Sequence, residues 1–425
     1  MKKIGVLHLI TSMNMGGGAR GVRTFYHYTQ DALSNHVVCY QKKGQKYDEF
    51  SKTCPTLNFA NGSQSFVKDY ITKHHIGIIH LYGRGVLEDF EKELLTDLKG
   101  RVKVVYTNIF GEFDPASDPL INLYLFKSKH ALTRIFAPHA GTQISKNSDF
   151  YNRLRVLPNP VDIDYFQKIK PNAAQIRQFK KSLNISDDTF VIGKIGSRKA
   201  IEKWSDLLLY MFPLVLDRHP NTVMLLQGVP DSRRHWIKRF GDCIRILNET
   251  TDDAELAVMY GSLDIFTHAS KIGEHSGNSL NEAMYWGKPV IVNLTPDKDN
   301  GQMEQVMPEV TGYFANDPAI YADHVSELLI NQKKRQRFGQ AAHNFVLQHN
   351  HPVKLADDLI SCYEFLLTGK SSALSISQDE IIQYNKEYAR LLEKNLSTRG
   401  KGLPLTHKIS KLNWKVRDYI DHNFR

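Results

Sequence analysis

The sequence predicts an α/β protein with two Rossmann-like, doubly wound domains. Short β-rich runs alternate with helical stretches along the chain, which is the pattern of parallel sheets covered by helices. These runs fall into two series, one in each half of the chain. A length of 425 residues also exceeds that of one typical domain. We therefore expect two domains in tandem that face each other across a cleft.

Each series contains five predicted strands. In the first half, the β-rich runs are 4–10, 36–41, 76–82, 102–107 and 134–137. In the second half, they are 190–195, 222–227, 243–247, 263–269 and 290–294. The join between the two domains is expected near 160–188, after the sequence Leu-Pro-Asn-Pro-Val-Asp that ends at Asp162.

The composition is that of an ordinary globular protein, with 41% hydrophobic and 24% charged residues. No run of about 18 apolar residues occurs, so no transmembrane helix is expected. The apolar stretch 4–10 is short and lacks a following cleavage site, so it indicates a first buried strand rather than a signal peptide. The four cysteines are far apart, which is typical of free thiols in a reducing cytoplasm.

The formal net charge of +10 favours anionic partners. Nucleotide-sugars, anionic membranes and nucleic acid all have the required charge. No finger, basic-zipper or aromatic RNA-binding signature occurs, and we therefore do not expect nucleic acid as a partner.

The most informative motif begins at Glu274 and places a second acid, Glu282, eight positions later. A helix over about 277–286 would put its apolar residues on one face, at Leu280, Ala283 and Met284. Gly277 has no Cβ, so backbone N–H groups can approach a ligand closely there. A helix N-terminus also attracts anions through its free donors and its dipole. The residues therefore indicate an anion site between two acids.

From Glu274 to Pro289 the chain resembles the signature of the retaining glycosyltransferases of the GT-B fold, the glycosyl transferases group 1 or family 4-like enzymes. In that family a Glu, seven residues and a second Glu bind a nucleotide-sugar. The resemblance implies that Glu274 orients the sugar and acts in catalysis, and that Glu282 binds the nucleoside. It further implies that the donor diphosphate is bound at Gly277, Asn278 and Ser279. An ordinary surface helix with exposed acids is the alternative.

The family also carries an Arg and a Lys after the first strand of the second domain, both directed at the donor diphosphate. We assign these catalytic roles to Arg198 and Lys203. Two cations would stabilise the negative charge of a leaving nucleoside diphosphate without a metal ion. Lys194 occupies another position that often holds Arg in the family. A solvated loop is the alternative for both assigned residues.

Gly16, Gly18 and Gly21 formally match the G-x-G-x-x-G pattern of dinucleotide-binding loops. Five residues separate the first strand from Gly16, and no acid follows the second strand. NAD or NADP binding is therefore disfavoured. The loop resembles instead the Gly-Gly-Ala loop of these glycosyltransferases, which makes Gly17 and Gly18 donor-site candidates. Arg20 stands where the family commonly has Glu, and a mere turn is the alternative.

Four further residues are candidates for contact with the acceptor or for the cleft. His80 ends an apolar strand, Arg84 follows it, and Asn108 takes the place of a cleft histidine common in relatives. Strand ends line the ligand site of doubly wound sheets. Glu304 stands where relatives often have an acid that frames the sugar. For His80 a core role is an equal alternative, and Glu304 could be an ordinary acid at a helix start.

Two D-x-D sequences, 162–164 and 297–299, are the type that holds a divalent metal in another glycosyltransferase fold. Neither follows a strand that faces the predicted donor, so both are interpreted as structural. We expect no metal ion and no cofactor beyond the donor substrate.

The resemblance covers residues 4–368 and implies a domain organisation. The predicted parts are an acceptor-side domain at 1–165, a nucleotide-sugar domain at 166–350, a helix at 351–370 that crosses back, and a basic helical tail at 371–425. A capping box at Ser377 to Glu380 opens the first tail helix, and apolar residues from Ile409 to Ile420 indicate a second. The tail is expected to pack on the body of the protein or on a second subunit, or else to dock on an anionic membrane.

The function that follows from the resemblance is sugar transfer from a nucleoside-diphosphate sugar to an acceptor hydroxyl, with retention of configuration. The acceptor would be a glycan or a lipid-linked glycan, and the enzyme would be cytoplasmic, with possible peripheral membrane contact. Another GT-B enzyme, either a phosphorylase or a sugar-nucleotide epimerase, is one alternative. A non-enzymatic nucleotide-binding or scaffold protein is the other. The sequence leaves the base, the sugar, the linkage and the oligomeric state open.

Overall fold

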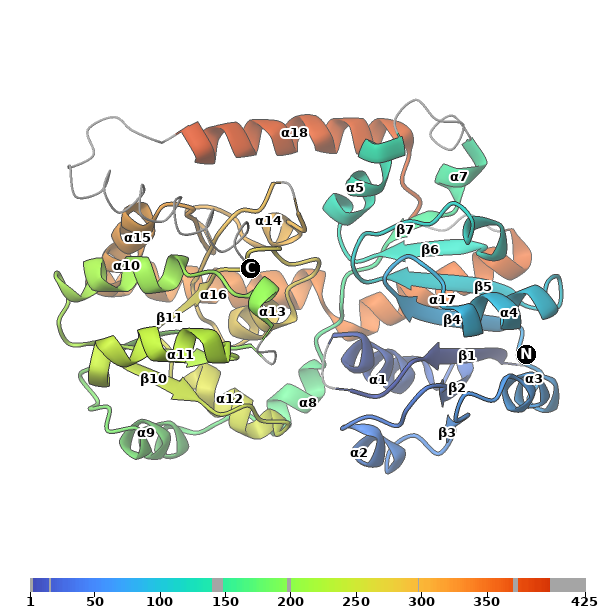
Figure 1. Cartoon of the computed structure of the whole chain (residues 1–425), viewed down its shortest axis with the longest axis horizontal. Helices are drawn as coiled ribbons and strands as arrows, with labels where there is room; N and C mark the ends of the chain where they lie inside the picture. The colour runs from blue at the N-terminus through green and yellow to red at the C-terminus, as the bar shows by residue number, and fades with distance from the viewer. Residues whose placement is uncertain are drawn as a thin grey trace. The chain divides into compact units, whose positions relative to one another are not determined.

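The structure is a computed structural model that describes residues 3–14, 17–139, 148–196, 200–296, 298–369 and 374–397. The chain divides into two compact units (Figure 1). The first unit is Met1–Ile163 with His349–Lys386, and the second is Asp164–Gln348 with Glu387–Arg425. The division falls two residues before the predicted boundaries at 165 and 350. Each unit is a parallel sheet with helices on both faces, as the sequence predicts for a GT-B protein.

The first unit has a seven-stranded sheet in the order β3-β2-β1-β4-β5-β6-β7, and every pair of neighbours is parallel. Its strands are β1 Ile4–Ile10, β2 Leu33–Cys39, β3 Leu57–Phe59, β4 Ile78–Gly83, β5 Lys103–Asn108, β6 Leu123–Phe126 and β7 Leu154–Val156. Its helices are α1 Gly17–Thr29, α2 Tyr47–Ser51, α3 Gln64–Lys73, α4 Asp89–Asp97, α5 Lys129–His139, α7 Ser148–Asn152 and α17 Pro352–Thr368.

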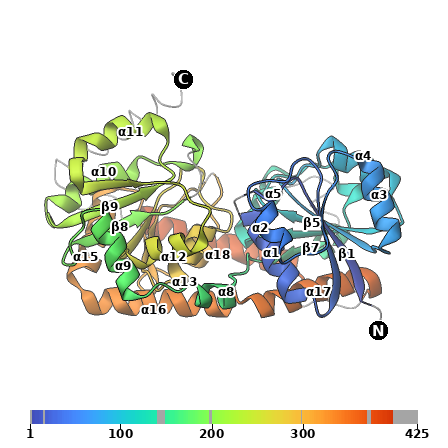
Figure 2. The same cartoon turned by 90° about the horizontal axis from the view of Figure 1, so that it is seen from below.

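Two apolar clusters cover the two faces of this sheet. On one face, Phe25 of α1 and Tyr363 of α17 pack with Val6 and Val105 of the strands. Figure 2 shows α1 and α17 side by side on that face. On the other face, the cluster joins α3, α4 and α5 to the alternate residues of the same strands. Helix α17, the counterpart of the predicted segment 351–370, thus packs within the first unit.

The predicted strand 134–137 is wrong, because these residues belong to helix α5. The hydroxyl of Ser128 accepts a hydrogen bond from the Ala131 amide at 3.2 Å, which caps the start of this helix. Ala131 and Leu132 are buried in the core. The strand that was expected there is β6, directly before the helix.

The second unit has a six-stranded parallel sheet in the order β10-β9-β8-β11-β12-β13. Its strands are β8 Phe190–Lys194, β9 Thr222–Gln227, β10 Ile244–Leu247, β11 Ile265–His268, β12 Val290–Val292 and β13 Gly312–Phe314. Its helices are α8 Ile163–Lys168, α9 Ala173–Ser182, α10 Leu207–Leu216, α11 Asp231–Ile237, α12 Asp253–Gly261, α13 Asn278–Tyr285, α14 Gln302–Gln305, α15 Pro318–Ile330 and α16 Gln332–His349. The core on one face is built mainly from α10 and α15, which pack on each other.

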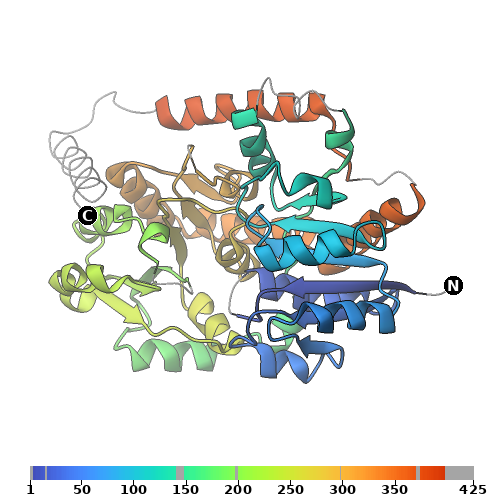
Figure 3. The same cartoon turned by 45° about the vertical axis from the view of Figure 1, so that its right-hand side comes forward.

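The first tail helix is α18, Gln378–Ser397, the orange-red helix along the top of Figures 1 and 3. Its capping box is present: the Ser377 amide donates to Glu380 at 2.8 Å, and the Glu380 amide donates to Ser377 Oγ at 3.2 Å. The second predicted tail helix lies outside the described residues. Within the residues that the structure describes, no helix is long and apolar enough to cross a membrane.

Candidate functional site

The candidate site lies where the strand order of the second sheet reverses. The chain runs from β8 outward to β10 and then returns to the other side of β8 to form β11. Ile192 and Gly193 of β8 pair with Ile265 and Phe266 of β11. In open α/β sheets, ligands bind at the carboxyl ends of the strands at such a switch point. The two strands end at this point with Lys194 and His268.

Lys194 is a buried cation at the end of β8. Its Nζ donates to the carbonyl of Ala269 at 2.6 Å and to the carbonyl of Lys203 at 3.3 Å. These bonds connect the loop after β8 with the loop after β11. Burial lowers the pKa of Lys194 to about 8, and the carboxylate of Glu274 partly opposes this shift. Lys194 therefore remains mostly charged at neutral pH.

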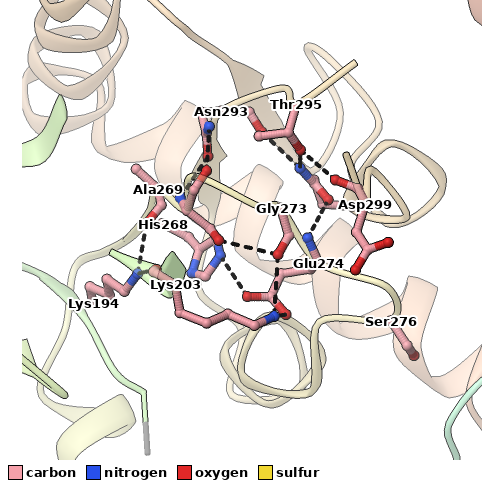
Figure 4. A network of polar contacts seen from close by, with 12 residues as sticks. Lys194, Lys203, His268, Ala269, Gly273, Glu274, Ser276, Asn293, Thr295 and Asp299 are labelled. Atoms are coloured by element: carbon pink, nitrogen blue, oxygen red, sulfur yellow. Dashed lines mark hydrogen bonds and ion pairs between the residues drawn. The ribbon is translucent and has the colours of Figure 1, made fainter. Parts of the chain in front are cut away.

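Glu274 lies in the loop after β11, with its carboxylate between a cation and an imidazole (Figure 4). One oxygen is 3.2 Å from Lys203 Nζ, and the other is 3.2 Å from His268 Nε2. Lys203 Nζ also donates to the Gly273 carbonyl at 3.3 Å. Only 17% of the Glu274 side chain is exposed. The loop thus holds a carboxylate that solvent barely reaches.

The electrostatics of this group keep Glu274 ionised. Burial by itself would raise the pKa of Glu274, but Lys203, His268 and Lys194 together hold it well below its usual range. The pKa of His268 is lowered, first by burial and then by Lys194. His268 is therefore neutral at pH 7 and can donate one N–H. The site combines one carboxylate with two ammonium groups, which leaves an excess of positive charge.

The backbone of Glu274 is fixed from both sides by the loop after β12. Its amide donates to Gln302 Oε1 at 3.0 Å, and its carbonyl accepts from the Gly301 amide at 2.7 Å. The two loops approach so closely that only glycine fits at Gly273, which has a φ of +67°, and at Gly301. A Cβ at position 273 would lie 1.7 Å from the Asp299 carbonyl oxygen, and a Cβ at position 301 would lie 2.2 Å from the His275 carbonyl oxygen.

Helix α13 begins directly after this loop, close to the predicted helix 277–286. Gly277 is its N-cap in the left-handed region, with a φ of +42°, and it provides no side-chain cap. Asn278 and Ser279 form the first turn and are half-buried, whereas Glu282 is 8% exposed. Ser276 Oγ is buried and has no hydrogen-bond partner among the described residues. In Figure 4 its side chain lies apart from the hydrogen-bonded network.

The structure brings some of the predicted residues together and adds others. Glu274 and Lys203 form an ion pair, and α13 follows Glu274 in the chain. Arg198 lies outside the described residues. Lys194, considered above only as an alternative position for the arginine, is part of the network. His268 was missed, although its place at the end of a predicted strand was a usable signal.

His80 is corrected from a cleft candidate to a core residue. It is fully buried in the first unit, with Nδ1 at 2.6 Å from Tyr363 Oη and Nε2 at 2.7 Å from Thr107 Oγ1. Burial also lowers its pKa well below the usual value. Both ring nitrogens are engaged, so His80 serves to connect β4, β5 and α17.

The remaining candidates differ in their surroundings. Arg84 is exposed and pairs with Glu112 at 2.9 Å. Asn108 is buried, and its Nδ2 donates to the Glu112 carbonyl at 2.6 Å while its Oδ1 accepts from the Gly111 amide at 2.7 Å. Its side chain thus holds the turn after β5. Gly17 and Gly18 are the first residues of α1 rather than part of a free loop.

The last candidates are Glu304 and the two D-x-D sequences. Glu304 is half-buried on α14. Asp162 accepts a hydrogen bond from Tyr28 at 3.1 Å, which gives the first D-x-D a structural contact. Asp297 lies outside the described residues, and Asp299 is 3.8 Å from His275 Nδ1. Over the part of the chain that the structure describes, no group of three or more acidic, His or Cys side chains is arranged to hold a metal ion.

Comparisons with known proteins relate the sequence to a family and the structure to known folds. Residues 175–345 match the family model described as "Glycosyl transferases group 1". The spore coat protein SA of Bacillus subtilis is 24% identical over 180 residues, which are 38% of this chain and 45% of that protein. The chain thus matches less than half the length of that relative.

Two solved structures show the same fold over most of the chain. A glycosyltransferase from Rickettsia africae has a TM-score of 0.69 at 15% identity, over 87% of this chain and all of the other. HepE from Anabaena, solved in complex with UDP, has a TM-score of 0.65 at 16% identity, over 85% and 100%. The chain therefore has the GT-B fold, and residues 175–345 within its second unit are similar to the group 1 glycosyl transferases.

Proposed function

We propose that this protein is a retaining, metal-independent glycosyltransferase that moves a sugar from a nucleoside-diphosphate sugar to an acceptor hydroxyl. The observation that carries the proposal is the ion pair of Glu274 and Lys203, 3.2 Å apart, at the switch point of the second sheet. Glu274, its carboxylate partner, lies in the loop that leads into the N-terminus of α13. A carboxylate for sugar hydroxyls, from the loop after β11, thus meets a cation for a diphosphate, from the loop after β8.

The charges at this site fit a donor with a diphosphate. Lys194 and Lys203 exceed the single carboxylate of Glu274 by one positive charge. The N-terminus of α13 adds free backbone donors and the positive end of its dipole. Ser276 Oγ, buried without a partner among the described residues, offers a further hydrogen bond to the donor. Arg198 is assigned to the same diphosphate, and Glu282 to the ribose.

The proposed reaction takes place on one face of the sugar. The bond between the anomeric carbon and the diphosphate oxygen breaks, and the acceptor oxygen bonds to the same face of that carbon. The acceptor proton passes to the departing diphosphate, so no protein base is required. Lys194 and Lys203 stabilise the negative charge that develops on the leaving group, and Glu274 holds the sugar through its hydroxyls. The acceptor is a glycan or a lipid-linked glycan.

A screen of donors tests the proposal and its alternatives. UDP, UDP-glucose, GDP-sugars and ADP-sugars are added to the full chain, and melting temperatures are compared; UDP is the first probe because Anabaena HepE was solved with it. A ligand that binds only the folded protein raises the melting temperature. Product analysis then separates transfer from phosphorolysis and epimerisation. A chain that binds a donor but never turns it over would instead be a nucleotide-binding scaffold.

The first prediction concerns the two donor contacts Lys203 and Glu282. Lys203→Ala and Glu282→Ala are each expected to weaken nucleotide binding by about ten- to a hundredfold, because each removes a hydrogen bond to a charged group, worth about 1.5–3 kcal/mol. Isothermal titration with the best nucleotide measures the change. Lys238→Ala, at an exposed lysine of the same unit, serves as the control. Unchanged affinity in both variants would remove these residues from the donor site.

The second prediction concerns metal ions. Transfer is expected to persist in EDTA, because two lysines and a helix N-terminus already neutralise the diphosphate. Initial rates are measured with EDTA and after addition of Mg²⁺ or Mn²⁺. Complete loss in EDTA that Mg²⁺ or Mn²⁺ restores would contradict the proposal and point to the D-x-D at 297–299.

A further inference from the structure

Helix α18 in the tail reaches the loop that supports Glu274. Residues 387–397 of this helix group with the second unit, and Tyr388 lies among them. The hydroxyl of Tyr388 accepts a hydrogen bond from Asn300 Nδ2 at 2.9 Å. Asn300 itself is fully buried. The region matched by the family model, 175–345, does not include this helix.

Asn300 is the centre of the loop after β12. Its Oδ1 accepts a hydrogen bond from the Thr295 amide at 3.0 Å, and Thr295 Oγ1 in turn donates to the Asp299 carbonyl. The Asp299 amide donates to the Ile272 carbonyl at 3.1 Å. These bonds close the loop on itself and attach it to the segment that leads to Glu274.

The two residues after Asn300 hold Glu274 directly. Gly301 donates to the Glu274 carbonyl, and the Gln302 side chain accepts from the Glu274 amide. Gln302 Nε2 is bonded to the Asn293 carbonyl at 3.0 Å, so its orientation is fixed as well. A shift of Asn300 would therefore be passed to the backbone of Glu274 within two residues.

We propose that Tyr388 is a positioning residue of the donor site, which fixes the orientation of Glu274 through Asn300 and residues 298–302 of the loop after β12. Its role in turnover rests on the function proposed above. Glu274 is bound by its backbone to a loop whose central side chain, Asn300, donates from Nδ2 both to the Tyr388 hydroxyl and to Met303 Sδ within the loop. Catalytic groups must be held closely in their productive geometry by the residues behind them. The tail helix thus contributes to the site without touching the donor.

The variant Tyr388→Phe removes the hydroxyl and keeps the ring. We expect the amides of Gly301 and Glu274 to exchange with solvent about two- to tenfold faster, because a hydrogen bond that holds their loop is lost. Hydrogen exchange read by NMR or mass spectrometry measures this without any ligand. Arg390→Ala, at an exposed residue of the same helix, is the control and is expected to leave both amides unchanged.

The ligand measurements use UDP and UDP-glucose. In Tyr388→Phe the affinity for UDP-glucose is expected to fall about two- to tenfold while the affinity for UDP stays the same, because Glu274 is assigned to the sugar. In the background of Glu274→Gln, the same change should have little further effect. A general loss of stability would lower both affinities alike, and the melting temperature of each variant detects it.

Two results would overturn the inference. One is unchanged amide exchange in Tyr388→Phe, and the other is an equal loss of UDP and UDP-glucose affinity. If the wild-type chain binds no nucleotide-sugar at all, the proposed function fails by itself. The exchange experiment still decides in that case whether Tyr388 orders the Glu274 loop.

Discussion

Replacing Glu274 with glutamine is expected to lower kcat/KM for sugar transfer by about 10²–10³-fold, while affinity for the free nucleoside diphosphate is kept. The carboxylate is assigned to the sugar and not to the diphosphate, so the loss should fall on turnover. Initial rates and titration with UDP measure the two quantities separately. Glutamine keeps the size of the side chain and removes its charge, which makes it a sharper change than alanine.

The stability of this variant has to be measured alongside its activity. The pKa of Glu274 in the folded protein lies below its ordinary value, so its ionisation stabilises the fold above pH about 4.5 and this stabilisation is lost as the pH falls. Glu274→Gln should therefore melt at a lower temperature at pH 7, with a smaller difference in acid. Glu255→Gln, at an exposed acid of α12, controls for charge alone. Near-normal transfer by a folded Glu274→Gln would reject the assignment.

The fold was largely predictable because its central strands are long buried runs. β1 and β9 have the predicted bounds, and the other predicted strands, apart from 134–137, differ by a few residues. The error at 134–137 arose because a short apolar run fits a strand or one face of a helix equally well. The hydrogen bond from the Ala131 amide to Ser128 favours the helix, and the hydrophobic pattern of the sequence does not show this contact. β3 and β13, with three residues each, are too short to show periodicity.

The candidate site was predictable only where its residues are close in sequence. Glu274 and Glu282 belong to one motif, and their spacing is visible in the chain. Lys194 and His268 come together through the pairing of β8 with β11, which requires the strand order. Tyr388 is 88 positions from Asn300, and no periodicity of the tail helix indicates which residue it contacts. For His80 the position in the sequence was known but its surroundings were not, since a residue at a strand end can lie in the core or at the surface.

The buried charge of Lys127 leads to the other large expected effect. Lys127 directly follows β6 and is 7% exposed. Its ammonium lies 5.8 Å from the centre of the Phe25 ring. Among the described residues, no carboxylate forms an ion pair with it. Burial lowers the pKa of Lys127 to about 7. A buried cation without an anionic partner destabilises a fold, and Lys127→Met should therefore stabilise the first unit.

The pH dependence of this gain has a definite sign. The folded pKa of about 7 lies below the unfolded value of 10.5, so the folded state binds fewer protons between these values, and the destabilisation is full below pH 7 and vanishes above pH 10.5. The methionine variant should gain about 5 kcal/mol at pH 6 and about 2 kcal/mol at pH 9. Chemical denaturation at both pH values measures the difference, with Lys99→Met, at an exposed lysine, as the control. A gain that does not depend on pH would show that burial of the ammonium charge is not its cause, and a loss of stability would show that Lys127 stabilises the fold.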